Sequence, residues 1–228
     1  MIALIDADIV AYRCSAACEN EKLAVAQKRT NGMLFDILMG VDHDDCFYDN
    51  WKLHLTGSGN FRNDVAVTAP YKGNRADKQK PKHLEGVRQH LVDSWDAVMN
   101  NGQEADDAIT IDATANEGNT IICSLDKDFM QKSGWHYNFI KKEHRFVSEE
   151  EGVRFFYSQI LMGDIADNIK GLSKVGPVKA NKMLAECTTE KEMYDVCVNA
   201  YSDEDRVIEN ARLLWLRRYE NQMWEPPK

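Results

Sequence analysis

Four groups of acidic residues have the types and spacing that metal-dependent chemistry needs. Glu104 and Asp107 are three residues apart, which would put both carboxylates on one helix face, and Asp164 and Asp167 repeat that spacing. Carboxylate oxygens suit Mg²⁺ and Mn²⁺, and two such ions can activate a water and stabilise the leaving oxygen in phosphodiester hydrolysis. The four groups are Asp6 with Asp8, Glu104 with Asp106 and Asp107, Asp126 with Asp128, and Asp164 with Asp167.

Each acidic group also has a plainer explanation. A single Asp at a strand end usually forms a turn or caps a helix, and acids in the first helical turn complement the helix dipole. Taken singly, these explanations are the better ones. Taken together, and with the turn that follows Asp167, the acids favour a shared site that would demand cations, because so many carboxylates repel one another.

A glycine-punctuated turn runs from Gly171 to Gly176, and Pro177 then opens a helix. The glycines let backbone amides and carbonyls point outward, and the helix would present its N-terminus. A hairpin of this kind between two helices can clamp one DNA backbone without reading bases. An ordinary hairpin between helices is the alternative, and the turn alone does not decide between them.

Two short apolar runs would deliver acids to the edge of a sheet. Residues 2–5 end at Asp6, and residues 120–123 lead to Asp126. Open α/β sheets place their ligand sites at the carboxyl ends of such strands. We also expect a helix over 9–28, a strand over 51–56, helices over 84–98 and 104–116, and a strand over 136–140. This order predicts an α/β fold, with a mostly parallel central sheet flanked by helices.

The pattern changes after Ser148, where a helix start with acids in its first turn is followed by helical periodicity. We expect helices over 149–162, 177–186, 189–200 and 203–220, and a frayed tail over 224–228. A domain boundary is therefore predicted near residue 148.

The net charge of −9 would by itself argue against a nucleic-acid partner. Its distribution matters more, because six basic and two acidic residues between Pro70 and His90 give that segment +4. A basic segment in an acidic chain can still bind phosphates.

The rest of the composition is typical of a cytoplasmic protein. The chain contains no apolar run of about 18 residues that could cross a membrane, and its start, MIALIDAD, lacks the features of a signal peptide. The six cysteines form no CxxC pair, which favours reduced thiols over disulfides. Cys14 and Cys18 are one helical turn apart, but no matching second pair supports a zinc site.

These motifs resemble those of a known family. GDIADNIKG at 163–171, followed by VGP and Lys179-Ala180, is similar to the helix–three-turn–helix of the flap endonuclease / 5′-3′ exonuclease superfamily, which has a PIN-like nuclease core. The resemblance covers roughly residues 1–185, and the compact size is similar to bacteriophage and short bacterial members. The other motifs follow in the family's order: Ile5-Asp6, Phe61-Arg62, Tyr71-Lys72-Gly73-Asn74-Arg75, Glu104-Ala105-Asp106-Asp107, and Ser124-Leu125-Asp126-Lys127-Asp128 with Gln131 beyond.

The resemblance implies two regions and a role for each motif. Residues 1–148 would form the PIN-like core, including a basic arch at about 61–90, and residues 149–228 a helical DNA-binding region with the helix–three-turn–helix at about 153–186. The implied metal ligands are Asp6, Glu104, Asp106, Asp107, Asp126, Asp128, Asp164 and Asp167, with Asp106 and Asp164 acting partly through water. The implied catalytic residues are Lys72, Arg75, Asp6, Asp107, Asp126 and Asp128, with Lys72 as the cation that offsets transition-state charge. The implied DNA contacts are Arg62, Lys72, Arg75, Gly171, Lys174, Gly176 and Lys179.

The chain departs from the family pattern in two places. The family usually has an Asp after its second strand, whereas Thr56-Gly57-Ser58 offers no carboxylate, and Asp8 is the candidate to compensate. Relatives commonly hold K⁺ on carbonyls of the hairpin. Lys170 stands where the family prefers Pro and Lys174 where it prefers its first hairpin Gly, so K⁺ is no more than an open alternative here.

The resemblance thus predicts a monomeric 5′-3′ exonuclease or flap endonuclease that uses two Mg²⁺ ions, with Mn²⁺ able to substitute. Its partner would be DNA with 5′ ends or flaps, in bacterial or phage-infected cytoplasm, and its role replication or recombination. Two alternatives stay open. One is a PIN-like ribonuclease, or a 5′ nuclease acting on RNA–DNA hybrids. The other is a non-catalytic protein that binds particular DNA structures.

Overall fold

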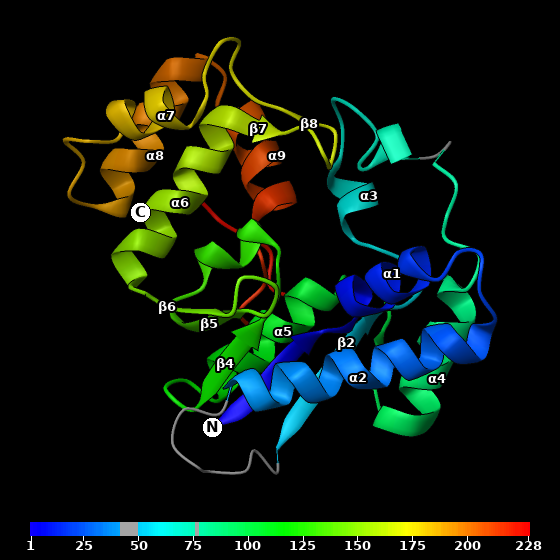
Figure 1. Ribbon diagram of the computed structural model, residues 1–228. Coiled ribbons are helices and arrows are strands. Elements are labelled where there is room, and N and C mark those ends of the chain that lie inside the picture. Colours follow the sequence, from blue (N-terminus) through cyan, green and yellow to red (C-terminus); the bar gives the residue numbers. More distant parts are fainter. Residues whose placement is uncertain (42–49, 76–77) are drawn as a thin grey trace. The chain divides into compact units, whose positions relative to one another are not determined.

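The structure, a computed structural model, describes residues 1–41, 50–75 and 78–228. The chain divides into two compact units (Figure 1). The first comprises Met1–Gly59, Gln79–Phe129 and Gly134–Val147, and the second Asn60–Lys78, Met130–Ser133 and Ser148–Lys228. The basic segment that we expected in the core is therefore divided, because residues 60–78 pack with the helical unit.

A six-stranded sheet in the order β3-β2-β1-β4-β5-β6 forms the first unit. Its neighbouring strands are parallel except for β6, which is antiparallel to β5. The strands are β1 (Ile2–Asp6), β2 (Trp51–Thr56), β3 (Val98–Asn100), β4 (Thr120–Cys123), β5 (Gly134–Asn138) and β6 (Glu143–Val147). The predicted α/β fold with a mostly parallel sheet is confirmed.

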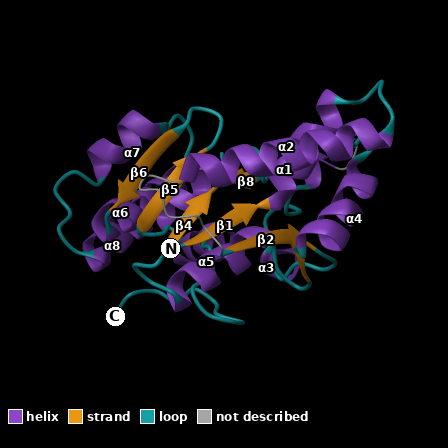
Figure 2. Ribbon diagram, turned by 60° about the horizontal axis from the view of Figure 1, so that its bottom comes forward, coloured by secondary structure: helices purple, strands orange, loops and turns teal. Residues whose placement is uncertain are grey.

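Helices cover both faces of this sheet. Figure 2 shows α1 (Ala7–Ala17) and α2 (Leu23–Val41) on one face and α5 (Ala105–Ala115) on the other. Helix α4 (Leu84–Trp95) shares the core of α1 and α2 through Val87 and Leu91, both fully buried. Parallel strands with both faces covered explain why the runs at 2–5 and 120–123 are continuously apolar.

Predictions and structure differ at several elements of this unit. The helix expected over 9–28 is two helices, because α1 ends at Ala17 and α2 begins only at Leu23. The helix expected to reach Val98 ends at Trp95, where Asp96 adopts a left-handed φ of 52° and β3 follows. Strand β6, which has few buried residues, was not predicted. Cys46 and the rest of 42–49 lie outside the described residues.

Helices and a two-stranded ribbon form the second unit. Its helices are α3 (Arg62–Val65), a 3₁₀ turn (Gly73–Arg75), α6 (Glu149–Met162), α7 (Pro177–Met183), α8 (Glu190–Tyr201) and α9 (Glu204–Leu214). The ribbon pairs β7 (Gly163–Asp164) with β8 (Ile169–Lys170). A 3₁₀ turn at Lys127–Gln131 begins in the segment of the first unit that ends at Phe129 and continues into the segment of the second unit that begins at Met130.

The core of the second unit reaches further along the chain than predicted. Phe156 of α6 packs edge-on against Trp215 at 4.9 Å and lies 5.9 Å from Trp224, measured between ring centroids. Trp224 is 5% exposed, so the tail expected to fray is anchored in the core. Among the described residues, no helix has both the length and the apolar character that crossing a bilayer requires.

Candidate active site

Asp6 lies where β1 passes directly into α1. Its carboxylate caps the helix by accepting the Ile9 amide at 3.2 Å, and it accepts the Ser124 hydroxyl at 2.8 Å. The parallel register explains the second bond, because Ile5 is level with Cys123 and the two strands therefore end side by side. Asp6 is only 2% exposed.

The pKa of Asp6 is raised to about 7, chiefly by burial and to a lesser extent by the negative charges of Asp8 and Asp126, while its hydrogen bonds from the Ser124 hydroxyl and the Ile9 amide act to lower it. The carboxylates at 6, 8 and 126 are therefore close enough to repel one another. An arrangement of this kind favours either a proton or a bound cation.

The loop after β4 holds its two acids in a compact turn. The Asp126 amide donates to the Ser124 hydroxyl at 3.0 Å, and the Asp128 amide donates to the Asp126 carboxylate at 2.9 Å. Ser124 therefore bonds to both Asp6 and the loop. This serine was part of the sequence motif, but its role in joining the ends of two strands required the structure.

Asp8 is engaged by groups that the sequence did not single out. The Arg88 guanidinium of α4 donates both to the Asp8 carboxylate and to the Thr56 carbonyl, and the Thr56 amide donates to the other Asp8 oxygen at 2.9 Å. Asp8 thus lies at the carboxyl end of β2, where the family's carboxylate is missing, but as the partner of an arginine. In the sequence, only the charge count between Pro70 and His90 had included Arg88.

The acids at the start of α5 form a reciprocal cap. The Asp107 carboxylate accepts the Glu104 amide at 3.2 Å, and the Glu104 side chain accepts the Asp107 amide. Asp107 is fully buried, Glu104 is 8% exposed and Asp106 is half-buried. The Thr56 hydroxyl accepts the Ala105 amide at 3.0 Å, which fixes the start of α5 to the end of β2.

In the second unit, Asp164 shapes the turn between β7 and β8. Its carboxylate accepts the Ala166 amide at 2.7 Å and the Asp167 amide at 3.4 Å. Asp164 is 5% exposed. Both acids therefore lie beyond α6, which ends at Met162 as the helix expected over 149–162 does, and their three-residue spacing falls on a turn.

Asp167 receives donors from the basic motif of its own unit. Its carboxylate accepts the Arg75 guanidinium at 2.6 Å and the Tyr71 hydroxyl at 2.8 Å, and the Lys72 ammonium lies 3.8 Å from it. The two candidate phosphate-binding cations are thus placed beside a candidate metal ligand.

The prediction that Arg62 contacts DNA requires correction. Its side chain is 1% exposed and donates to the Leu213 and Trp215 carbonyls, both at 2.8 Å. The guanidinium also lies over the ring of Phe61 at 4.6 Å. Arg62 therefore binds the end of α9 inside the second unit, and we remove it from the candidate DNA contacts.

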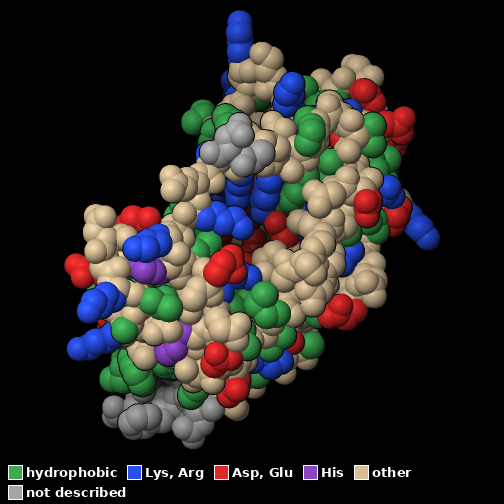
Figure 3. All heavy atoms as spheres, turned by 90° about the vertical axis from the view of Figure 1, so that its right-hand side faces the viewer, with side chains coloured by type: hydrophobic (Ala, Val, Ile, Leu, Met, Phe, Trp, Pro, Cys, Tyr) green, Lys and Arg blue, Asp and Glu red, His purple; other side chains and the backbone are tan. Residues whose placement is uncertain are grey.

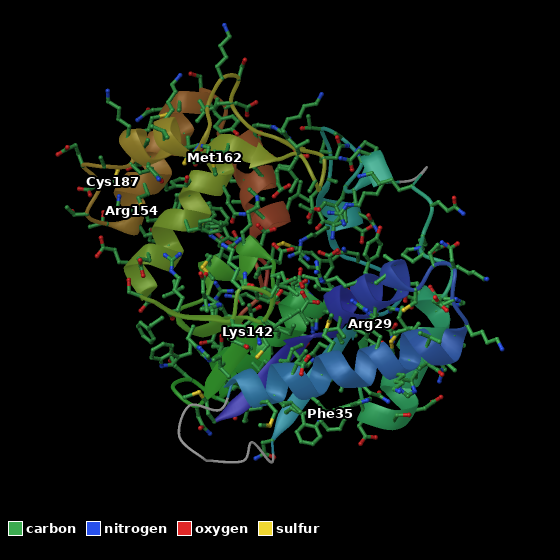
Figure 4. The ribbon with its side chains drawn as sticks, in the orientation of Figure 1. Arg29, Phe35, Lys142, Arg154, Met162 and Cys187 are labelled. Atoms are coloured by element: carbon green, nitrogen blue, oxygen red, sulfur yellow. The ribbon has the colours of Figure 1, made fainter. Side chains whose placement is uncertain are left out.

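The hairpin differs along its length in how tightly it is packed. Gly171 packs closely against the end of α6. A Cβ added to Gly171 would lie 2.0 Å from the Met162 carbonyl carbon. Lys174 adopts a left-handed φ of 60° where the family prefers Gly. Lys174, Gly176 and Lys179 are exposed and available for contact with a backbone. Arg154 of α6 donates to the Cys187 carbonyl at 2.9 Å and holds the segment after α7 (Figure 4).

The donor chemistry fits a hard divalent cation, because every candidate ligand is a carboxylate. Within 1–41, 50–75 and 78–228, however, no three His, Cys, Asp or Glu side chains are grouped as a preformed metal site. Mg²⁺ typically keeps several waters and binds through one or two carboxylates, so it does not require such a group. The candidate ligands at 164 and 167 belong to the second unit and the others to the first.

Two surface features lie outside this set of acids. The face seen in Figure 3 carries Lys and Arg as well as Asp and Glu side chains, so the acidic excess of the chain does not give that face a single sign. A cavity of about 390 Å³ lies in the first unit between α2 and the turn after β5, lined by residues that include Arg29, Asp36 and Lys142. Arg29 and Lys142 are labelled in Figure 4.

No family model matches the sequence. Solved structures do match the fold. A bacteriophage T5 5′-exonuclease with bound divalent zinc ions has a TM-score of 0.66 and 17% identity, over 93% of this chain and 88% of that one. The chain has the flap endonuclease fold. A bacteriophage T5 flap endonuclease in a complex with DNA and metal ions gives 0.65 and 16% over the same shares of the chains. The catalytic core of Rad2 in complex with DNA substrate gives 0.60 and 14% over 99% and 83%. The resemblance inferred from the motifs is thereby confirmed at the level of the fold.

Proposed function

We propose that this protein is a divalent-metal-dependent 5′ nuclease that hydrolyses DNA phosphodiesters at 5′ ends or flaps. One observation supports the proposal: on a flap endonuclease fold, the buried Asp6 at the end of β1 is joined through Ser124 to the loop that carries Asp126 after β4. Asp6 and Asp126 therefore follow the carboxyl ends of β1 and β4, at the edge where α/β sheets commonly hold their ligands.

We assign the metal ligands as the sequence predicts them, with Asp6, Asp126 and Asp128 at the centre. Glu104, Asp106 and Asp107 at the start of α5 are the other candidate ligands of the first unit, and Asp164 and Asp167 are the candidate ligands of the second unit. The chemistry that bound Mg²⁺, or Mn²⁺ in its place, supplies is activation of a water and stabilisation of the leaving oxygen. Ser124 holds Asp6 and the 126–128 loop in position for this purpose.

Lys72 and Arg75 would bind the phosphate that is cut. An Arg fork matches two phosphate oxygens and a Lys offers a compact charge, so the pair would orient the phosphodiester and offset the charge that builds on its oxygens. Lys174, Lys179 and the hairpin backbone at Gly171 and Gly176 would hold the duplex through its phosphates, which predicts weak sequence preference.

The test is a 5′-flap duplex labelled at either end and incubated with Mg²⁺ or with EDTA. We expect cuts near the flap junction or from the 5′ end that need the metal, slowed by at least about 100-fold in Lys72→Ala. Asp126→Asn with Asp128→Asn should abolish cleavage while binding in EDTA persists. Unchanged cleavage in that double variant would overturn the metal assignment.

Two alternative functions give different results with the same substrates. A nuclease for RNA or RNA–DNA hybrids would cut a matched RNA flap faster than the DNA flap. A non-catalytic DNA-binding protein would bind the flap without cutting it in Mg²⁺ or in Mn²⁺. The second alternative has a specific structural basis, because the end of β2 carries Thr56 and an Arg88–Asp8 pair in place of a free carboxylate.

A further inference from the structure

Hydrogen bonds from backbone and side-chain groups join the basic motif at 71–75 to the turn at 164–168. Both segments belong to the second unit. The bonds are from the Lys72 amide to the Asp167 carbonyl at 2.9 Å, the Asn74 amide group to the Ile165 carbonyl at 2.6 Å, the Arg75 Nε to the Ala166 carbonyl at 2.9 Å, and the Asn168 amide group to the Pro70 carbonyl at 2.9 Å. The two segments therefore form one connected surface.

The charges on this surface are compensated internally. Arg75 and Lys72 both face the Asp167 carboxylate, at 2.6 and 3.8 Å, and Tyr71 donates to it at 2.8 Å. The Arg75 side chain is nevertheless 44% exposed and that of Lys72 is 27% exposed. A second anion from solution can therefore reach both cations.

Backbone strain accompanies these contacts. Lys72 has a φ of 53° and Asn168 a φ of 62°, a left-handed conformation that residues with side chains rarely adopt. Each strained residue makes a backbone or side-chain bond to the opposite segment. Strain of this kind persists only where surrounding contacts hold it, and it is concentrated at functional sites.

We propose that Asp167 is an internal anion that occupies Lys72 and Arg75 in the DNA-free protein, and that a phosphate of the DNA strand displaces it. The inference rests on the proposed function and adds a regulatory step to it. Carboxylate and phosphate oxygens accept the same Arg and Lys donors, so the two anions compete for one site. Displacement also frees the Asp167 carboxylate, so DNA binding and the availability of this acid are coupled.

The experiment measures DNA affinity in EDTA, where cleavage and metal binding are absent. Fluorescence anisotropy with a labelled 5′-flap duplex compares wild type, Asp167→Asn and the control Asp195→Asn. Asp195 forms an exposed ion pair with Lys191 on α8, so its substitution makes the same charge change away from the motif. We expect Asp167→Asn to bind about tenfold more tightly than wild type and the control to differ by less than about twofold.

A cycle of variants separates unmasking of the cations from a general loss of negative charge. In a Lys72→Ala/Arg75→Ala background, Asp167→Asn should leave DNA affinity unchanged, because no cation remains to be freed. Equal tightening in both backgrounds would overturn the proposal, since the acid would then act only by repelling DNA.

A replacement variant and the affinity of wild type show whether a negative result concerns this inference alone or the proposed function as well. If Asp167→Asn does not give a folded protein by circular dichroism, Asp167→Ser replaces it, with the same expected tightening. If wild type binds the flap and neither Asp167→Asn nor Asp167→Ser changes its affinity, the displacement of Asp167 by phosphate is contradicted and the proposed function is not. Wild type that does not bind the flap at all contradicts the proposed function and this inference with it.

Discussion

The Arg62 guanidinium donates from Nε to the Leu213 carbonyl at 2.8 Å, although the motif that contains this arginine suggested a DNA contact. The same guanidinium lies 5.9 Å from the centre of the Tyr71 ring. Arg62 therefore links the start of the basic segment to the end of α9 from inside the second unit. A charged residue in a motif can thus position a binding segment without touching the ligand.

Arg62→Met should destabilise the protein by about 2–4 kcal/mol, because two carbonyls at the end of α9 lose their donor in a buried place. Urea unfolding followed by circular dichroism measures this. Arg75→Met is the matched control, since the Arg75 side chain is 44% exposed, and it should cost less than about 1 kcal/mol. DNA affinity should fall more in Arg75→Met than in Arg62→Met, because Arg75 is the candidate phosphate contact. A large loss of affinity in a stably folded Arg62→Met would contradict the structural role.

The hairpin glycines should differ sharply in their tolerance of alanine. A Cβ on Gly171 would lie 2.0 and 2.1 Å from the carbonyl carbon and oxygen of Met162, which are backbone atoms that cannot rotate away. Gly171→Ala should therefore cost about 3 kcal/mol or more. Gly176 has no atom within 4 Å of the same position and a φ of −115°, so Gly176→Ala should cost less than about 1 kcal/mol. Thermal unfolding of the pair tests this, and equal melting temperatures would contradict it.

The sequence predicted those features that depend on local pattern and on motif order. The apolar runs before Asp6 and Asp126 gave the strands, and the conjunction of motifs gave the fold. The break between α1 and α2 was missed because helical residues such as Ala16 and Ala17 lead into a short turn without Gly or Pro. Strand β6 was missed because an edge strand with one buried residue lacks the expected alternation.

Side-chain partners at the candidate site could not be predicted, because they join residues far apart in the sequence. Nothing in the spacing shows that Arg88 pairs with Asp8, or that Arg75 reaches Asp167 instead of solvent. The exposure of Arg62 was misjudged for the same reason. A basic residue in a basic segment is usually solvated, and only the packing of α9 against α3 shows that this one is buried.

The pKa of Asp6 predicts a pH dependence of stability in the metal-free protein. Because burial raises this pKa from 3.8 to about 7, the folded state holds a proton that the unfolded state releases between those values. The contribution of Asp6 is thus fully present below about pH 4 and is lost as the pH rises through about 7. Asn caps a helix as well as Asp does, so Asp6→Asn removes the charge and keeps the cap. In EDTA the variant should gain stability relative to wild type as the pH rises, by about 4 kcal/mol at pH 8. An equal stability difference at pH 5 and pH 8, from urea unfolding, would contradict this.

The pair formed by Arg88 and Asp8 predicts a non-additive effect on stability. Arg88→Met would leave the Asp8 carboxylate beside Asp6 without its cation, and should cost about 2–3 kcal/mol in EDTA. Asp8→Leu would leave the arginine without its carboxylate and take the acceptor from the Thr56 amide. Each single variant leaves one charge without its partner, whereas the double variant leaves none. The double variant should therefore lose less stability than the two single losses added together, by about 1–2 kcal/mol.

The cycle is measured by urea unfolding, first in EDTA and then with Mg²⁺. Additive costs in EDTA would show that Asp8 is not held by Arg88. If Mg²⁺ stabilised Arg88→Met by more than it stabilised wild type or Asp8→Leu, Asp8 would prove to be a metal ligand that the arginine keeps from metal.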